Sequence, residues 1–245
     1  MSPFVAEIIG TMLLILLGNG VVANALLSKT KGGDAGIVGI AIAWGLAVYV
    51  GVLVAGPYSG AHLNPAVSVG LAVTGQFEWG LVPIYIAGQC IGAALGSILV
   101  VLSYYDHYKQ TDNLDFKLAS FATTPAIPNV IPNILTEAIG TFVLLFSVLY
   151  IAGPELTLEG MEDTTIGLGS LGALPVALIV VVIGFSLGGP TGYAINPARD
   201  LIPRIMHGIL PIGERRDSAW SYAWIPVVAP LIGAVCAAGL YLALQ

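Results

Sequence analysis

The octapeptide GAHLNPAV occupies residues 60–67, and a variant of it, GYAINPAR, occupies residues 192–199. Glycine, asparagine, proline and alanine recur at the same places in the two stretches, whereas a given tripeptide arises by chance about once in several thousand positions. The two stretches therefore indicate an internal duplication. In each one the Asn-Pro step predicts the start of a helix, because Asn is a favoured N-cap and Pro is favoured at the first helical position.

The overall composition is that of a membrane protein. Of the 245 residues, 57% are hydrophobic and only 9% are charged, and the mean hydropathy is +0.91. Soluble domains have about a quarter of their residues charged. The formal net charge of −6 comes mostly from short stretches between apolar runs, so it describes loops and indicates no nucleic-acid partner.

Residue types that usually carry chemistry are sparse. Cys90 and Cys236 both fall inside apolar runs, at matching places in the two halves, which favours packing over a disulfide or a metal site. His62 has no Cys, Asp or second His beside it at metal-ligand spacing, so we expect it to position backbone. Without a nucleophile–base pair or a ligand cluster in the sequence, we expect no enzyme activity, no metal and no cofactor.

Six apolar runs are long enough to cross a membrane, which takes about 20 residues. They cover residues 4–27, 36–55, 80–104, 132–151, 166–187 and 221–244. Two shorter runs begin at Asn64 and Asn196 and extend about ten residues each, so they predict re-entrant half-helices. The first long run contains Glu7 and has no basic segment before it, which favours a retained helix over a cleaved signal.

The two halves form an inverted repeat. AEIIGT at residues 6–11 opens the first run, and TEAIGT at residues 136–141 opens the fourth. Each half holds three spans and one half-helix, and an odd number of spans makes the second half enter the membrane from the opposite side. The sequence thus predicts an all-α integral membrane protein built from two inverted halves.

We expect a single channel domain over residues 1–245. Its first repeat covers about residues 1–105, a connecting loop about 106–129, and its second repeat about 130–245. A further loop, residues 153–165, carries Glu155, Glu159, Glu162 and Asp163.

The irregular backbone before each Asn-Pro step points to a pore. Such backbone is not tolerated in lipid, so it must be buried in protein or line a water-filled space. With half-helices entering from opposite faces, their positive N-terminal ends and the side chains of Asn64 and Asn196 meet near the midplane, where they repel cations. Arg199 lies on the first turn of its half-helix, so we expect it to project into the same space rather than snorkel to the interface.

Glu7 and Glu137 occupy matching places at the starts of their runs. An ionisable group at membrane depth is costly and usually faces the protein interior. We expect both to accept hydrogen bonds from backbone N–H groups of the irregular loops, in preference to relaying protons. Small residues at four-residue spacing predict close helix approach; they are Gly88, Gly92 and Gly96 in the third span and Gly233 and Ala237 in the sixth.

These features together resemble the aquaporin family of major intrinsic proteins over essentially the whole chain. NPARD at residues 196–200 is similar to the glycerol-facilitator branch, because water-selective members usually lack the acid that follows the arginine. Pro226 fits that branch too. The resemblance implies a homotetramer in the plasma membrane, with one pore in each protomer for passive, bidirectional flow of glycerol, water and small neutral solutes such as dihydroxyacetone, urea or undissociated lactic acid, without ions or protons.

The resemblance also assigns roles to individual residues. It implies that the narrowest constriction is formed by Trp44, Gly184, Tyr193 and Arg199, with Gly184 leaving room for a three-carbon solute. Tyr193 stands where glycerol facilitators more often have phenylalanine, so an extra hydroxyl is expected in the filter. The paired motifs comprise Asn64, Pro65, Ala66, Asn196, Pro197 and Ala198, and Asp200 is assigned a structural role. Pore-facing carbonyls are expected from Gly60, Ala61, His62, Gly192, Tyr193 and Ala194.

The membrane orientation implied by the family conflicts with the distribution of charge. The family places both termini in the cytoplasm, yet basic residues occupy the loops that this topology puts outside, against the positive-inside rule; they are Lys29, Lys31, Lys109, Lys117, Arg215 and Arg216. Three other functions stay open from the residues alone: a water-selective channel, a coupled secondary transporter and a structural membrane protein.

Overall fold

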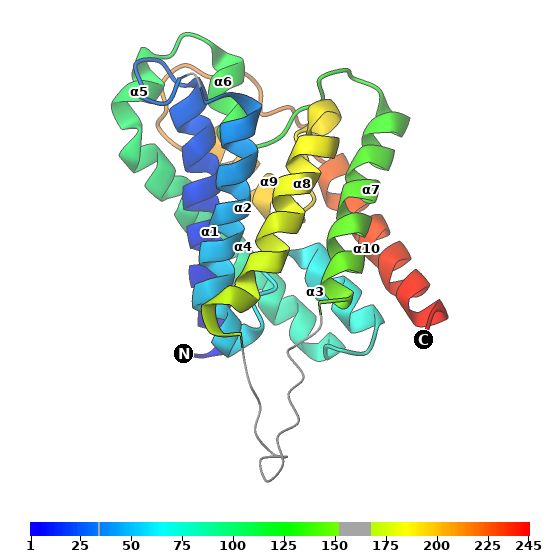
Figure 1. Ribbon diagram of the computed structural model, residues 1–245. Helices are drawn as coiled ribbons and strands as arrows, with labels where there is room; N and C mark the ends of the chain where they lie inside the picture. Colours follow the sequence, from blue (N-terminus) through cyan, green and yellow to red (C-terminus); the bar gives the residue numbers. More distant parts are fainter. Residues whose placement is uncertain (34, 152–167) are drawn as a thin grey trace.

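Six long apolar helices form the body of the protein (Figure 1). The computed structural model describes residues 1–33, 35–151 and 168–245, and every regular element in these ranges is helical. The six spans are α1 (Pro3–Leu26), α2 (Gly36–Ser59), η1 with α4 (Trp79–Leu81 and Val82–Ser103), α7 (Val130–Leu149), η2 with α8 (Gly169–Ala173 and Leu174–Thr191) and α10 (Ile225–Ala243). The predicted number of spans is confirmed. The four acidic residues expected in the 153–165 loop lie outside the described residues.

Two predicted helix ends were one turn too early. We expected the second span to end at Ala55 and the fifth at Leu187, but α2 continues through Pro57 to Ser59 and α8 continues through Pro190 to Thr191. Both helices end at a left-handed glycine, Gly60 or Gly192, whose N–H closes the last turn.

The half-helices are α3 (Pro65–Val73) and α9 (Pro197–Ile209). Each begins directly after its asparagine, whose side-chain oxygen accepts a hydrogen bond from a backbone N–H of the first turn. With 9 and 13 residues they are too short to span. In Figure 1, α3 lies in the half of the molecule nearer the termini and α9 in the other half.

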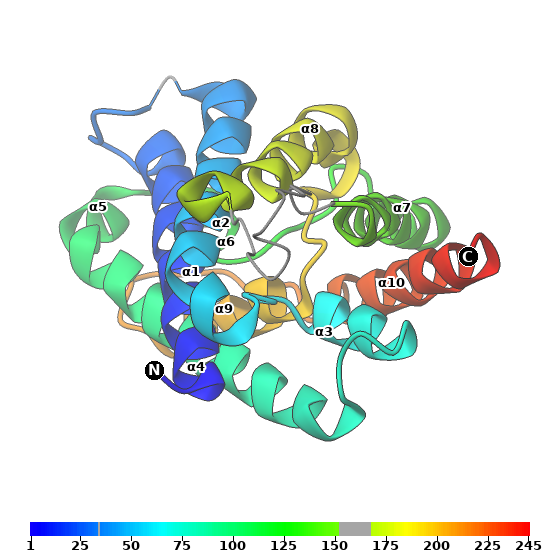
Figure 2. The same cartoon turned by 60° about the horizontal axis from the view of Figure 1, so that its bottom comes forward.

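The helices pack with the symmetry of the repeat. In the first half α1 packs on α2 and α4, and in the second α7 packs on α8 and α10. The halves meet where α2 packs on α8, and each half-helix crosses over, α3 onto α10 and α9 onto α4 (Figure 2). Each half-helix therefore packs on a spanning helix of the other repeat.

Two of the glycines predicted to allow close helix approach lie at equivalent helix–helix contacts in the two repeats. A Cβ at Gly92 would clash with the carbonyl oxygen of Ile8, and one at Gly233 would clash with that of Ala138. Ile8 and Ala138 directly follow the paired glutamates. The α1–α4 and α7–α10 contacts are thus backbone against backbone at matching places.

The segment that joins the halves is more structured than the predicted loop. It contains two short helices, α5 (Tyr105–Gln110) and α6 (Leu114–Ala119). Asn113 caps α6 by accepting from two backbone N–H groups. Lys117 of α6 is 2% exposed and donates to the carbonyl oxygen of Glu214, 2.8 Å away. This segment therefore anchors the loop between α9 and α10.

Candidate functional site

Two short loops of unusual backbone lead into the half-helices. Both hold three residues in the left-handed region, at equivalent positions. The φ angles are 76°, 51° and 51° at Gly60, Ala61 and Leu63, and 80°, 40° and 44° at Gly192, Tyr193 and Ile195. Each residue other than glycine costs on the order of 1 kcal/mol or more in this conformation, so the surroundings must hold the loops in place.

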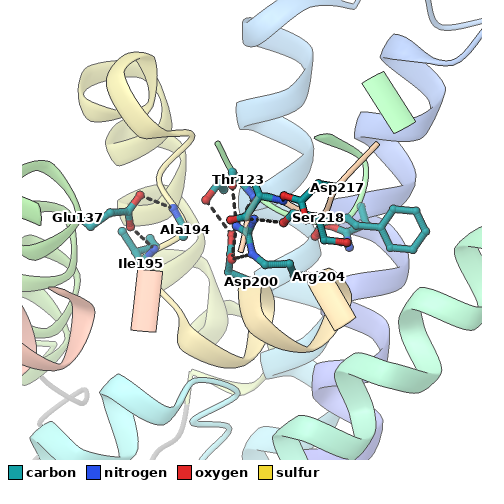
Figure 3. Close-up of polar contacts among 11 residues, drawn as sticks. Thr123, Glu137, Ala194, Ile195, Asp200, Arg204, Asp217 and Ser218 are labelled. Carbon is teal, nitrogen blue, oxygen red and sulfur yellow. Dashed lines mark hydrogen bonds and ion pairs between the residues drawn. The ribbon is translucent and has the colours of Figure 1, made fainter. Parts of the chain in front are cut away.

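The paired glutamates hold these loops. Both are fully buried. Glu7 accepts from the backbone N–H groups of His62 and Leu63, at 3.0 and 2.8 Å. Glu137 accepts from the equivalent N–H groups of Ala194 and Ile195, at 3.0 and 2.8 Å (Figure 3). Each carboxylate thereby satisfies two backbone donors of its loop.

The first glutamate has a richer set of partners than the second. Glu7 also accepts from the Ser59 hydroxyl and the Gln89 amide, at 2.7 and 2.8 Å. His62, expected to position backbone, has its Nδ1 3.0 Å from the hydroxyl of Ser68 on α3. These side chains tie α1, α3 and α4 to the first loop.

The two asparagines bridge the repeats. The amide nitrogen of Asn64 donates to the carbonyl oxygen of Ile195, and that of Asn196 donates to the carbonyl oxygen of Leu63, both at 2.8 Å. Their side-chain oxygens cap their own half-helices. An amide has two N–H donors, so each asparagine keeps a second one toward the cavity that it lines.

A cavity of about 330 Å³ runs between the repeats. The polar part of its lining comes from the two loops, the two asparagines and Arg199. The rest of the lining is almost entirely apolar and comes from α1, α2, α3, the end of α7 and the η2–α8 segment; it comprises Leu14, Trp44, Val48, Val52, Val67, Leu71, Leu144, Val148, Ile151, Gly172, Val176 and Val180. The cavity is therefore amphipathic.

Arg199 and Trp44 meet at this cavity. The guanidinium carbon of Arg199 lies 4.2 Å from the centroid of the Trp44 ring, a cation–π contact. The neighbouring acid does not neutralise the arginine, because Asp200 pairs with Arg204 at 2.6 Å. Arg199 Nη1 is buried without an acceptor among the described residues. A solute in the cavity would therefore meet a charged donor group.

Asp200 instead organises a buried network (Figure 3). Its carboxylate accepts from the backbone N–H and the hydroxyl of Thr123, at 2.8 and 2.7 Å. Arg204 donates to the carbonyl oxygens of Thr123 and Ser218, both at 2.7 Å. The network joins α9 to the segments that precede α7 and α10. Our sequence reasoning missed Arg204, although its spacing of four residues from Asp200 on one helix was a usable signal.

Tyr193 lies against Gly184, where the sequence predicted open space for a solute. A Cβ at Gly184 would be 3.0 Å from Cζ and 3.2 Å from the hydroxyl oxygen of Tyr193, and Gly184 is not among the cavity-lining residues. The hydroxyl is buried and has no hydrogen-bond partner in the described part of the chain. The space beside Gly184 is thus filled by the Tyr193 ring and by the Ala41 side chain of α2, and Tyr193 also lines the cavity.

Comparison with known proteins agrees with this architecture. The family model described as "Major intrinsic protein" matches residues 1–241. The chain belongs to the major intrinsic protein family. The resemblance read from the paired motifs is therefore confirmed, and so is the aquaporin-like fold, since the chain superimposes on the X-ray structure of the aquaglyceroporin from Plasmodium falciparum with a TM-score of 0.81, at 31% identity over 97% of this chain and 93% of that one.

Two relatives are similar in sequence over almost the whole chain. The probable glycerol uptake facilitator protein of Thermotoga maritima is 52% identical over 241 residues, covering 98% of each chain. The glycerol uptake facilitator protein of Streptococcus pneumoniae is 48% identical over 237 residues, covering 97% of each chain.

Proposed function

We propose that this major intrinsic protein is a passive channel for glycerol, water and other small neutral solutes. The observation that carries the proposal is the amphipathic cavity between the repeats, whose lining combines hydrogen-bonding groups of the two loops with aliphatic and aromatic groups of the surrounding helices. A polyol needs both, because its hydroxyls must replace lost water while its carbons require an apolar surface. The names of the relatives in Thermotoga maritima and Streptococcus pneumoniae support glycerol as the solute.

Three side chains form the proposed constriction. Trp44 and the ring of Tyr193 supply its apolar walls, and Arg199 supplies its donors. Gly184 contributes by giving the Tyr193 ring a place against α8. Acceptors come from backbone carbonyls of the two loops, at Gly60, Ala61, His62, Tyr193 and Ala194, which line the cavity; Gly192, also expected there, does not line it. Two N–H groups of each loop bond a buried glutamate instead.

We expect the groups at the centre of the cavity to exclude ions and protons. The N-termini of α3 and α9 converge there, and each carries a partial positive charge that repels cations. Asn64 and Asn196 present one N–H each to a passing water. A water that accepts from both must donate outward in both directions, so a continuous proton wire is interrupted.

Liposome swelling tests the proposal. Purified protein reconstituted at several protein-to-lipid ratios should raise the permeability to glycerol, urea and water in proportion to its amount, without saturation and without an ion gradient. Water flux without glycerol flux would favour a water-selective channel. Saturable flux that depends on an ion gradient would favour a coupled transporter, and no flux would favour a structural protein.

We further propose that residues 1–245 form one channel domain that assembles as a homotetramer in the plasma membrane with cytoplasmic termini. Both termini lie at the same end of the molecule, as six spans require (Figure 1). The family supports a cytoplasmic assignment, whereas the basic residues gather in the connections at the opposite end. In a variant without Cys90 and Cys236, labelling of single cysteines added at the N-terminus or in the α5–α6 connection, in intact cells, decides the orientation.

A further inference from the structure

The two aromatic walls of the constriction each rest on a glycine that does not line the cavity. Gly18 of α1 lies against the indole ring of Trp44, and Gly188 of α8 lies against the phenol ring of Tyr193. Both glycines are buried. We propose that Gly18 and Gly188 set the width of the pore by seating these two rings.

The contact at Gly188 leaves no room for a methyl group. A Cβ there would lie 2.6 Å from Cδ1 and 3.1 Å from Cε1 of Tyr193, whereas ordinary van der Waals contact begins near 3.4 Å. The backbone of Tyr193 is fixed by the left-handed conformation and by the neighbouring bond from the Ala194 N–H to Glu137. The ring must therefore move away from α8, and the open space beside it is the cavity.

The contact at Gly18 is tighter still. A Cβ at this position would clash with three carbons of the Trp44 ring, namely Cε3, Cζ3 and Cη2. The same ring lies under the guanidinium group of Arg199. A methyl group at Gly18 would thus displace Trp44 and disturb its contact with Arg199, so it would act on two walls of the constriction from a position outside it.

The chain provides matched controls on the same two helices. A Cβ built at Gly20 of α1 or at Gly189 of α8 meets nothing within 4 Å in the described structure. Alanine in place of glycine raises helix propensity at all four positions. Gly20→Ala and Gly189→Ala therefore change the helix backbone in the same way without touching either aromatic ring.

The inference rests on the proposed function, and one set of flux measurements separates the two. Glycerol and water permeabilities are measured by stopped-flow light scattering on proteoliposomes of the parent and the four alanine variants. We expect Gly18→Ala and Gly188→Ala to lower glycerol permeability by about tenfold and to lower water permeability less, while the control variants match the parent. A parent without glycerol flux would contradict the proposed function, whereas variants equal to their controls would contradict only the seating role.

A double-variant cycle separates seating from misfolding. Tyr193→Ala removes the ring that the new methyl would meet, so adding Gly188→Ala to it should have no further effect on the ratio of glycerol to water permeability. Should Gly188→Ala alone fail to fold, the double variant should fold. A double variant that fails too, or one that shows the full effect of Gly188→Ala on the ratio, would overturn the proposal.

Discussion

The side-chain nitrogen of Asn64 lies 2.8 Å from the carbonyl oxygen of Ile195, a residue of the opposite repeat. The reciprocal bond runs from Asn196 to the carbonyl oxygen of Leu63 at the same distance. Each asparagine thus caps its own half-helix with its oxygen and holds the other repeat with its nitrogen. The meeting point of the half-helices is therefore tied together directly, and the amide groups are fixed in orientation before a solute arrives.

Asn196→Asp should break this arrangement. A carboxylate keeps the cap but has no N–H, so it loses the bond to Leu63 and faces a carbonyl oxygen instead. We expect a loss of about 1–3 kcal/mol in stability, lower glycerol flux and a measurable cation leak. Thermal unfolding in detergent and flux in proteoliposomes check this. A variant that keeps its unfolding midpoint, its flux and its ion exclusion would contradict the role given to Asn196.

Glu137→Gln should loosen the second loop. The substitution replaces one acceptor oxygen by an NH₂ group, which then faces a backbone N–H of Ala194 or Ile195. One buried donor is left unpaired at a cost of about 1–3 kcal/mol, and glycerol flux should fall because the loop that carries Tyr193 is held less firmly. Glu214→Gln, at an exposed position, is the control. Equal unfolding midpoints for the two variants would count against the loop-holding role.

The buried pair of Asp200 and Arg204 should matter far more than the exposed pair of Asp115 and Arg216. Arg204→Leu leaves a carboxylate buried without its ion partner, which costs about 3–5 kcal/mol. Arg216→Leu should cost at most about 1 kcal/mol, because its side chain is 42% exposed and that of Asp115 is 70% exposed. Unfolding midpoints of both variants provide the comparison, and similar shifts would show that the network does not anchor α9.

Tyr193→Phe should leave selectivity unchanged. The hydroxyl is buried beside Gly184 without a partner among the described residues, so it offers nothing to a solute and carries a desolvation cost. We expect the ratio of glycerol to water permeability to stay within about twofold, since the groups facing the cavity are the same. A large change in this ratio would mean that the hydroxyl does reach the solute.

Gly184→His should reduce glycerol flux much more than water flux. The first carbon of a side chain at this position would already lie 2.9 Å from Cβ of Ala41 and 3.0 Å from Cζ of Tyr193. An imidazole therefore has to displace the Tyr193 ring, which borders the open cavity, whereas Ala41 is part of the packed helix α2. A narrower constriction excludes a three-carbon solute before it excludes water. Stopped-flow measurements of both solutes on one proteoliposome preparation test this, and equal losses would contradict the filter assignment.

The duplicated motif made much of the architecture predictable. Asn64-Pro65 and Asn196-Pro197 are local signals that start helices, and their repetition indicated the duplication. The odd number of spans in each half then predicted the inverted topology. Helix ends were less predictable, because Pro57 and Pro190 lie in last turns that continue to a left-handed glycine. The proline interrupts the residue pattern that predicts a helix, but the helix itself continues past it.

Contacts between distant residues could not be read from the sequence. Thr123 meets Asp200 from 77 positions away, and no local pattern indicates that partner. The rotation of the Tyr193 ring toward Gly184 and Gly188 depends on the conformation of its loop, so the sequence assigned the space beside Gly184 to the solute. The short helices α5 and α6 have 6 residues each, too few for a hydrophobic period to be visible.

The most direct test of the account measures glycerol and proton movement in the same vesicles. Purified protein is reconstituted with a trapped pH-sensitive dye, and glycerol influx is followed by light scattering while a pH gradient is imposed. We predict that glycerol permeability rises in proportion to the amount of protein and that the proton leak stays equal to that of empty vesicles. Absence of glycerol flux, or a proton leak that rises with the amount of protein, would contradict the account.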